Sequence, residues 1–344
     1  MKQTDHIVTI HDDRYHYTSG YYTDNRWLDD DTLIIARSKF PDKEYNELVR
    51  VSLKDESIEL ICDDVKGWSS HVVWKDLVYY TDGQEIRVID TKTNEKKVIY
   101  KRDFDEISSF CMPSITNDGK TICIYGCNDD VGGFFATVDV ETGKCRKMLS
   151  KKFAPPFITA NHGMICPENP DRIFFAHEGI TFSVSNRLWI YDAKLDKAWN
   201  IAKQNLDEDG NLADCFGHEM WAPDGKGMYF TKYPCSPKGP KGVCYVDIET
   251  GKIDVLYSKY NYWHTGVSRD GKFILADTTD NGTTYSEVVV IDRSDNTETI
   301  IDTPEISWNH PCHPHPQMSP DNTKVCYTAL DDAGRTCVKV AYLK

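Results

Sequence analysis

The densest group of metal-ligand side chains in this chain lies at residues 308–317, where three of the eleven histidines fall within six positions. These are His310, His313 and His315, interleaved with three prolines. In an extended segment His313 and His315 point to the same side, and His310 can join them only across a bend. The prolines supply that bend and exclude a helix interior or a central strand, because they lack a backbone donor. The spacing predicts a site for zinc, copper, nickel, iron or manganese, and oxygen ligands would shift the preference toward manganese. The alternative is a proline-rich surface turn with incidental histidines.

Composition limits the classes of protein to consider. The chain has 344 residues, 40% of them hydrophobic, and a formal net charge of -14. Such an acidic chain argues against a nucleic-acid partner. The twelve cysteines form no CxxC pair and indicate buried thiols of a reducing compartment. The N-terminus has no apolar signal segment, and no stretch approaches the length of a membrane span, so we expect a cytoplasmic protein without a membrane partner.

A repeated turn followed by a β-rich run organises the whole chain. An Asp-containing turn precedes each of seven such runs, and successive copies are roughly 42 to 53 residues apart, the range expected of four-stranded propeller blades. The runs are Thr32–Ala36, Leu77–Thr81, Thr121–Tyr125, Arg172–Ala176, Gly227–Lys232, Phe273–Asp277 and Lys324–Thr328. Within each unit a second turn, such as Asp139-Val140-Glu141-Thr142-Gly143, is expected to close the middle hairpin.

The two ends of the chain complete each other. The last unit ends with Cys337–Leu343 and has no fourth strand. At the N-terminal end, His6–Ile10 is a β-rich segment that belongs to no other unit. Pairing the two would close the ring. The sequence therefore predicts an all-β fold, a seven-bladed β-propeller closed by its N-terminal strand, forming a single domain over residues 1–344. A count of six or eight blades is the main structural alternative.

Histidines recur at one phase of the repeat. His218 precedes the turn at residues 223–225, His264 precedes the turn at 269–271, and the histidine cluster precedes the turn at 320–322. Connections into the inner strands form the face on which propellers usually carry their sites. We therefore expect these histidines to converge at one end of the central channel.

With these residues in view, the sequence resembles the oligogalacturonate lyases, a family of cytoplasmic seven-bladed propeller enzymes. The run from His310 to Asp321 matches the family pattern of a Gln followed by His-Pro-His-Pro and a Ser/Thr-Pro-Asp turn, with His310 standing at the Gln position. The segment Gly217–Gly225 matches the family's Thr-His-Glu-Phe-Trp-x-Pro-Asp-Gly run. Arg187 follows a His-Glu-Gly motif, as in the family. The resemblance covers residues 160–344.

The resemblance implies roles for these residues. It makes His264, His310, His313 and His315 the ligands of a divalent metal, manganese first, with zinc or nickel as alternatives. It also makes His218 the catalytic base and Arg187 the catalytic partner of the substrate carboxylate.

Two further histidines, His162 and His177, are candidates for substrate contact. His177 begins the His-Glu-Gly motif and is a candidate together with Glu178, and His162 lies one unit before His218. A structural turn is the alternative for His177.

The implied function is a metal-dependent lyase. It would cleave uronate-containing oligosaccharides, oligogalacturonides first, by β-elimination to 4,5-unsaturated products, so its partner would be an acidic oligosaccharide. One alternative is a lyase for a different uronate sugar, such as a rhamnose-glucuronate unit. Another is a TolB-like or WD-type propeller that binds proteins without catalysis. The sequence leaves the oligomeric state open.

Overall fold

The structure is a computed structural model and describes residues 2–21, 25–279 and 282–344. Within these ranges the regular structure consists of strands, with no helix. Accordingly, the described residues include no helix with the length and apolar character needed to cross a membrane. The twelve cysteines are all free thiols.

The chain forms two compact units. The first consists of Met1–Asp82, Ile89–Lys96 and Asn261–Lys344, and the second of Gly83–Val88 and Lys97–Tyr260. The prediction of a single domain over residues 1–344 is not tested by this division and stays a prediction.

Three sheets lie in the first unit. The first joins β2 (Tyr15–Thr18), β4 (Thr32–Lys39), β5 (Glu47–Ser52) and β6 (Ile58–Cys62), with β3 (Trp27–Asp29) paired to β4. The second joins β23 (Tyr262–Val267), β24 (Phe273–Thr278), β25 (Val288–Asp292) and β26 (Thr297–Asp302). The third joins β27 (Gln317–Met318), β28 (Lys324–Leu330), β29 (Thr336–Leu343) and β1 (Thr4–Ile10).

Three sheets lie in the second unit. The first joins β11 (Cys111–Ile115), β12 (Thr121–Asn128), β13 (Gly132–Asp139) and β14 (Cys145–Lys151). The second joins β15 (Ala160–Cys166), β16 (Asn169–His177), β17 (Leu188–Asp192) and β18 (Lys197–Asn200). The third joins β19 (Phe216–Trp221), β20 (Gly227–Lys232), β21 (Gly242–Asp247) and β22 (Ile253–Tyr257). The remaining sheet joins β7 (His71–Trp74), β8 (Leu77–Thr81), β9 (Glu85–Asp90) and β10 (Lys96–Lys101).

Seven successive sheets of this kind are the blades of a β-propeller, so the predicted all-β, seven-bladed fold is confirmed. Each of the seven predicted β-rich runs lies within the second strand of a sheet, from β4 to β28. The repeated turns are therefore reliable markers of blade order.

The second kind of turn has a different place from the one expected. It joins the third strand of a sheet to the fourth, as between β13 and β14, and not the middle pair. Asp139 Oδ1 accepts hydrogen bonds from the backbone N–H of Thr142 at 2.8 Å and from its Oγ1 at 2.7 Å. Gly143 follows with φ of 68°, a conformation that glycine adopts without steric cost. The predicted turn chemistry is correct, but the hairpin to which it was assigned is wrong.

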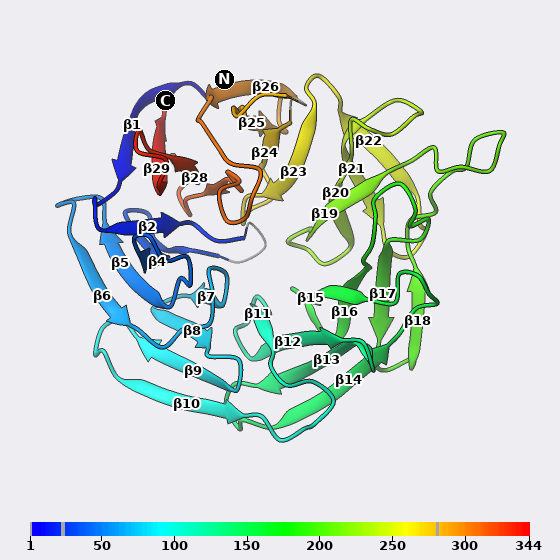
Figure 1. Ribbon diagram of the computed structural model, residues 1–344, viewed down its shortest axis with the longest axis horizontal. Helices are drawn as coiled ribbons and strands as arrows, with labels where there is room; N and C mark the ends of the chain where they lie inside the picture. Colours follow the sequence, from blue (N-terminus) through cyan, green and yellow to red (C-terminus); the bar gives the residue numbers. More distant parts are fainter. Residues whose placement is uncertain (1, 22–24, 280–281) are drawn as a thin grey trace. The chain divides into compact units, whose positions relative to one another are not determined.

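The N-terminal strand completes the last blade, as predicted. In the first unit β1 pairs antiparallel with β29, with Ile7 opposite Ala341 and Val8 opposite Val340. Figure 1 shows β1 in blue beside β29 in red. Ile10 at the end of β1 is buried in a cluster with Tyr17 and Val338. Closure is therefore made by backbone pairing and by apolar burial together.

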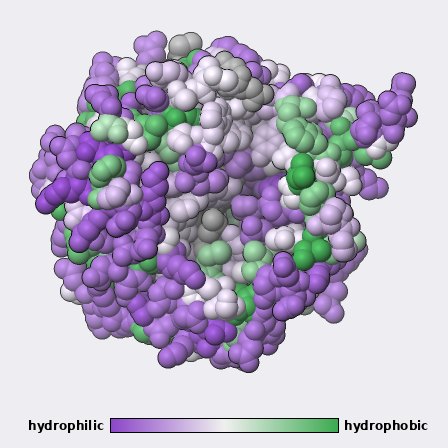
Figure 2. Space-filling model, viewed as in Figure 1, coloured by the Kyte–Doolittle hydropathy of each residue, from purple (hydrophilic) through white to green (hydrophobic). Residues whose placement is uncertain are grey.

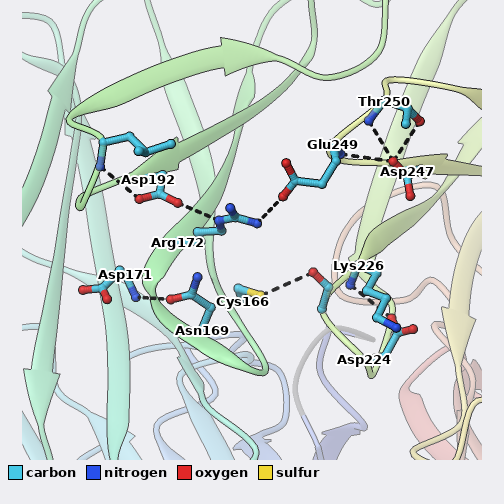
Figure 3. Close-up of polar contacts among 12 residues, drawn as sticks. Cys166, Asn169, Asp171, Arg172, Asp192, Asp224, Lys226, Asp247, Glu249 and Thr250 are labelled. Carbon is cyan, nitrogen blue, oxygen red and sulfur yellow. Dashed lines mark hydrogen bonds and ion pairs between the residues drawn. The ribbon is translucent and has the colours of Figure 1, made fainter.

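Polar contacts hold two sheets of the second unit together. The guanidinium of Arg172 on β16 bonds Asp192 through Nε and Glu249 through Nη1, both at 2.7 Å (Figure 3). Asp192 belongs to the same sheet as Arg172, whereas Glu249 lies in the turn after β21. The Cys166 thiol also donates to the carbonyl of Gly225 at 3.6 Å. These bonds fix β15 and β19 as neighbours, and both strands carry candidate site residues.

The surface has the character expected of the composition. The face drawn in Figure 2 is mostly hydrophilic, with small, separate hydrophobic patches. Apolar side chains are instead buried between sheets, as in the cluster of Phe174, Leu188, Phe230 and Val246 in the second unit.

Deleting residues 1–10 tests the closure. The deletion leaves β29 as an unpaired sheet edge and removes buried Ile10, whose burial alone contributes about 1.5–3 kcal/mol. We expect a lower melting temperature and a tendency to self-associate, measured by calorimetry and light scattering. A truncated chain that melts like the full chain and stays equally soluble would contradict the role of β1.

Candidate active site

Three of the four predicted metal ligands lie together in the first unit. His264 stands on β23, and His313 and His315 come from the segment between β26 and β27. One ring nitrogen from each can be chosen so that all three lie within 4.8 Å of one another, and all three residues are buried. Facing imidazoles at such separations match the coordination of a single divalent ion.

The segment that carries His313 and His315 is an ordered, buried connection. Residues 311–319 are buried, and the N–H of Thr328 on β28 donates to the carbonyl of Pro314 at 2.9 Å. His315 has φ of 44°, an uncommon left-handed conformation for a residue other than glycine. The alternative of a surface turn with incidental histidines is therefore wrong.

Asp277 at the end of β24 fixes the orientation of His264. Both carboxylate oxygens lie 2.7 Å from His264 Nδ1, and they also accept the backbone N–H groups of His264 at 3.0 Å and of His315 at 3.2 Å. Burial raises the pKa of Asp277 to about 7. The Nδ1 proton of His264 is then shared with this carboxylate, and Nε2 of the same ring is the nitrogen that can face a metal. This is the usual arrangement of a metal-binding histidine. Asp277 was not among the residues predicted from sequence.

His313 supplies the observation that tests the fit of a metal. Neither of its buried ring nitrogens has a hydrogen-bond partner among the described residues. Burial, reinforced by nearby His310, lowers the pKa of His313 to about 4, so the ring is neutral at neutral pH. A buried polar side chain without a partner is costly unless something satisfies it. Neutral imidazoles grouped in this way fit a divalent transition metal.

His310, the fourth predicted ligand, lies beside this group but outside it. It is exposed, its ring centroid is 4.1 Å from that of His313, and it stacks on Trp68 at 5.2 Å with an interplanar angle of 15°. Within the described part of the chain, the compact group of ligand atoms consists of His264, His313 and His315. Ligation by His310 stays a prediction. Trp68 was missed, because nothing in its local sequence distinguishes it from a core tryptophan.

The other four predicted site residues lie in the second unit, and two of them share a network of charges. His162 Nε2 lies 3.2 Å from Glu178 Oε2, and Glu178 Oε1 lies 3.1 Å from Nη1 of Arg187. The Nε of Arg187 bonds Glu219 Oε1 at 2.5 Å. Arg187 is thus held between two carboxylates, which raise its pKa against the effect of burial.

His218 adjoins this network through its neighbour Glu219. Its ring makes an edge contact with the ring of Tyr233, with centroids 5.8 Å apart. The preceding residue, Gly217, is packed so closely that a Cβ there would lie 2.1 Å from Tyr233 Oη. The absence of a side chain at Gly217 thus lets the backbone of β19 lie against the ring of Tyr233, next to His218.

A common backbone irregularity presents both His162 and His218. The pairing register of β15 shifts between Asn161 and Met164, and that of β19 shifts between Gly217 and Met220. His162 lies in the first shift with φ of 55°, and His218 lies in the second with φ of 52°. Bulged strands re-aim side chains, and such conformations cost on the order of 1–3 kcal/mol each, so they are typical of functional sites.

His177 is tied to its own surroundings. Its Nδ1 lies 2.8 Å from Asn186 Oδ1 and its Nε2 lies 2.7 Å from the carbonyl of Phe157. The ring stacks on Phe153 with centroids 3.7 Å apart. A substrate contact by His177 would replace one of these bonds, and that role stays a prediction.

Glu219 is a site residue of this unit that was not predicted from sequence, whereas Glu178 was a candidate only together with His177. A signal for Glu219 was present, because it directly follows His218, as Glu178 follows His177. Neighbouring residues on a strand point to opposite faces, and the bulge of β19 changes that geometry.

The fold and these two groups of side chains define a seven-bladed propeller with a buried three-histidine site. No family model matches the chain. In sequence it is 24% identical over 286 residues to the oligogalacturonide lyase of Pectobacterium atrosepticum, covering 74% of this chain and 71% of that protein.

Solved structures of the same fold include an oligogalacturonate lyase in complex with manganese, with a TM-score of 0.81, 17% identity, and coverage of 99% of this chain and 95% of the other. An oligogalacturonate lyase from Vibrio parahaemolyticus gives a TM-score of 0.78 at 15% identity, covering 99% and 98%. TolB from Acinetobacter baumannii gives 0.50 at 14% identity, covering 87% and 77%. The resemblance to the oligogalacturonate lyase family, first drawn from motifs, is confirmed.

A graded set of variants tests the metal centre. Asp277→Asn only loosens His264 and should weaken binding of Mn²⁺ or Zn²⁺ by ~10–100-fold. His313→Ala removes a predicted ligand and should weaken binding of the same ions by more than that. His310→Ala should have the smallest effect, because His310 lies outside the compact group. Untagged protein would be measured by elemental analysis and calorimetric titration, with exposed His11→Ala as the control. Equal metal content in all four variants would contradict this centre.

The pH dependence of stability tests the Glu178 network. Burial opposes ionisation of Glu178, but the hydrogen bond with His162 and the charge of Arg187 prevail and lower its pKa from 4.5 to about 2. A depressed carboxyl pKa contributes stability above pH 4.5 that is lost as the pH falls toward 2.

Glu178→Gln should therefore lower the free energy of unfolding by on the order of 1 kcal/mol at pH 7, and by progressively less below pH 4.5. Urea unfolding of both proteins across this range gives the difference. The exposed Glu208→Gln is the matched control. A difference that does not change with pH would show that Glu178 is not ionised through this network.

Proposed function

We propose that this chain is a lyase that cleaves oligogalacturonides by β-elimination and uses a divalent metal. The observation that carries the proposal is the convergence of His264, His313 and His315 into one buried group. The motifs shared with the oligogalacturonate lyases mark the same three residues as metal ligands. The sequence relative named oligogalacturonide lyase and the two lyase structures support the same activity.

The reaction is difficult because of charge. The proton on C5 of a uronate is acidified only by the neighbouring carboxylate, whose own negative charge opposes a second one developing beside it. His264, His313 and His315 would hold the metal, which would supply Lewis-acid stabilisation of that carboxylate. The protein must then provide a base for the C5 proton and a fixed position for the sugar.

The acid–base work is assigned to the second unit. His218 is the proposed base, and its left-handed conformation on the bulge of β19 fixes its direction. Arg187 is the proposed partner of the substrate carboxylate, for which one of its bonds to Glu178 or Glu219 must be exchanged. His162 and His177 are proposed to contact the sugar. The resemblance assigns these residues and the metal ligands to one reaction.

The metal is proposed to be Mn²⁺. The support is a structural neighbour described as an oligogalacturonate lyase in complex with manganese. Imidazole ligands also suit Zn²⁺ and Ni²⁺, so both should compete with Mn²⁺ in vitro. We also propose a cytoplasmic location, in keeping with cysteines that are free thiols.

Two alternatives lead to different outcomes in one assay. A lyase for a rhamnose-glucuronate unit would use the same scaffold on another uronate. A protein-binding propeller of the TolB type is a weaker fold match, at a TM-score of 0.50, and gives the histidine group no role. Galacturonate, glucuronate and mixed rhamnose-uronate oligomers would be incubated with the protein and Mn²⁺, and the ultraviolet absorbance of an unsaturated product followed. Absence of product from every oligomer would remove the lyase proposal.

Replacing His218 separates the base from the metal ligands. His218→Asn suits the left-handed backbone, because asparagine adopts that conformation more readily than most residues. We expect kcat to fall by ~10²–10⁴, with metal content and KM nearly unchanged. Added Mn²⁺ should not restore the activity, whereas it should partly restore that of His313→Ala. Near-full turnover of His218→Asn would assign the base to another residue.

A further inference from the structure

The stereochemistry of a galacturonate requires two proton-transfer groups. This inference rests on the proposed lyase function. In a galacturonate unit the C5 proton and the C4 oxygen lie on opposite faces of the ring. A base that removes the proton from one face cannot also protonate the oxygen that leaves from the other. The leaving oxygen is a poor leaving group unless it is protonated, so a general acid is needed opposite the base.

The second unit contains a histidine equivalent to His218 on the neighbouring inner strand. β15 and β19 lie side by side, because the indole N–H of Trp221 on β19 donates to the carbonyl of Met164 on β15 at 3.2 Å. His162 and His218 occupy the same place in the bulges of these strands, each one residue after the register breaks. Their φ angles of 55° and 52° are nearly equal. The fold therefore presents two histidines in the same way from adjacent blades.

His162 has a carboxylate partner. His162 Nε2 lies 3.2 Å from Glu178, and Glu178 is in turn bound through both oxygens by Arg187, at 3.1 and 3.4 Å. A carboxylate held in this way orients the imidazole and stabilises its protonated form. The network holds two ion-paired carboxylates, Glu178 and Glu219, against one guanidinium.

We infer that His162, held by Glu178, is the general acid that protonates the C4 oxygen as it leaves, while His218 removes the C5 proton. Glu178 then acts as the positioning residue for the acid, and Arg187, the proposed partner of the substrate carboxylate, also holds Glu178.

The proton balance of the step is closed. The C5–H bond breaks and its proton goes to His218, the electron pair forms the C4–C5 double bond, and the C4–O bond breaks. The departing oxygen takes the proton on His162 Nδ1, while Nε2–H stays on Glu178. Solvent returns His162 and His218 to their starting states, so no oxidant or co-reactant is needed.

Several titratable groups lie near His162. Glu178, directly after β16, is its ion-pair partner, and Arg187 and Glu219 lie beyond Glu178. Cys127 on β12 lies in the field of Glu178, and burial, with the charge of Glu178 as a smaller cause, raises the pKa of its thiol.

The test uses two substrates and two variants of the metal-loaded, full-length chain. One substrate is a galacturonate trimer, and the other is a galacturonate with a nitrophenyl group on O4, whose departure needs no proton. His162→Asn, which keeps the left-handed backbone, should lose ~10²–10⁴ in kcat on the trimer and remain within about tenfold of the parent on the aryl substrate. His218→Asn should be impaired on both. The exposed His11→Asn is the control and should match the parent.

The pH profile gives an independent measurement. The parent should show a bell-shaped kcat/KM, with an acid limb from the base and an alkaline limb from the acid. His162→Asn should lose the alkaline limb, and Glu178→Gln should move that limb to lower pH because the imidazolium loses its counter-ion. Glu178→Asp, which retains the charge, should restore part of the shift.

The outcomes separate the inference from the function on which it rests. An inactive parent would remove the lyase proposal and this inference together. An active parent with an alkaline limb retained in His162→Asn, or with equal losses on both substrates, would overturn the assignment of His162 alone. Activity confined to glucuronate, whose C5 proton and C4 oxygen share a face, would also overturn it, because one group can then serve as both base and acid.

Discussion

This structure depends on the pairing of short antiparallel strands. That pairing is interrupted at the inner strand of successive blades. Register shifts occur in β11, β15 and β19 of the second unit and in β23 of the first. A strand with unbroken pairing alternates its side chains between two faces and fixes their direction. The bulge frees one position from that rule. His162 and His218 stand at such positions, so the irregularity that weakens the ladder is what presents the reactive groups.

The two units solve the problem of burying polar groups in different ways. In the first, Asp277 satisfies the backbone of His264 and His315 and one ring nitrogen of His264, while the remaining imidazole nitrogens are suited to a metal. In the second, the charge of Arg187 is matched by two glutamates at close range. A buried ion pair contributes little net stability, because desolvation offsets most of the attraction. The network is better explained by the fixed geometry that it gives to His162.

The sequence predicted features with local causes and missed those that depend on contacts through space. The Asp-containing turns specified the second strand of every blade, because turn chemistry resides in four or five adjacent residues. The pairing of β1 with β29 followed from counting strands. The convergence of His264, His313 and His315 followed from their common phase in the repeat. By contrast Asp277 and Trp68 meet this group only through the fold, and neither has a distinctive neighbour in sequence. The second turn was assigned to the wrong hairpin because an Asp- and Gly-containing turn has the same residues whichever two strands it joins.

The position of His310 shows how small the difference between two arrangements of this site is. Stacking of its ring on Trp68 is worth ~0.5–1.5 kcal/mol, which is less than a metal–imidazole bond contributes. His310 lies 4.1 Å from His313 between ring centroids, so it borders the compact group without belonging to it. The family has an amide oxygen donor where this chain has His310, and an imidazole there favours softer ions than an oxygen does. By stacking on His310, Trp68 fixes where that imidazole lies beside the three-histidine group.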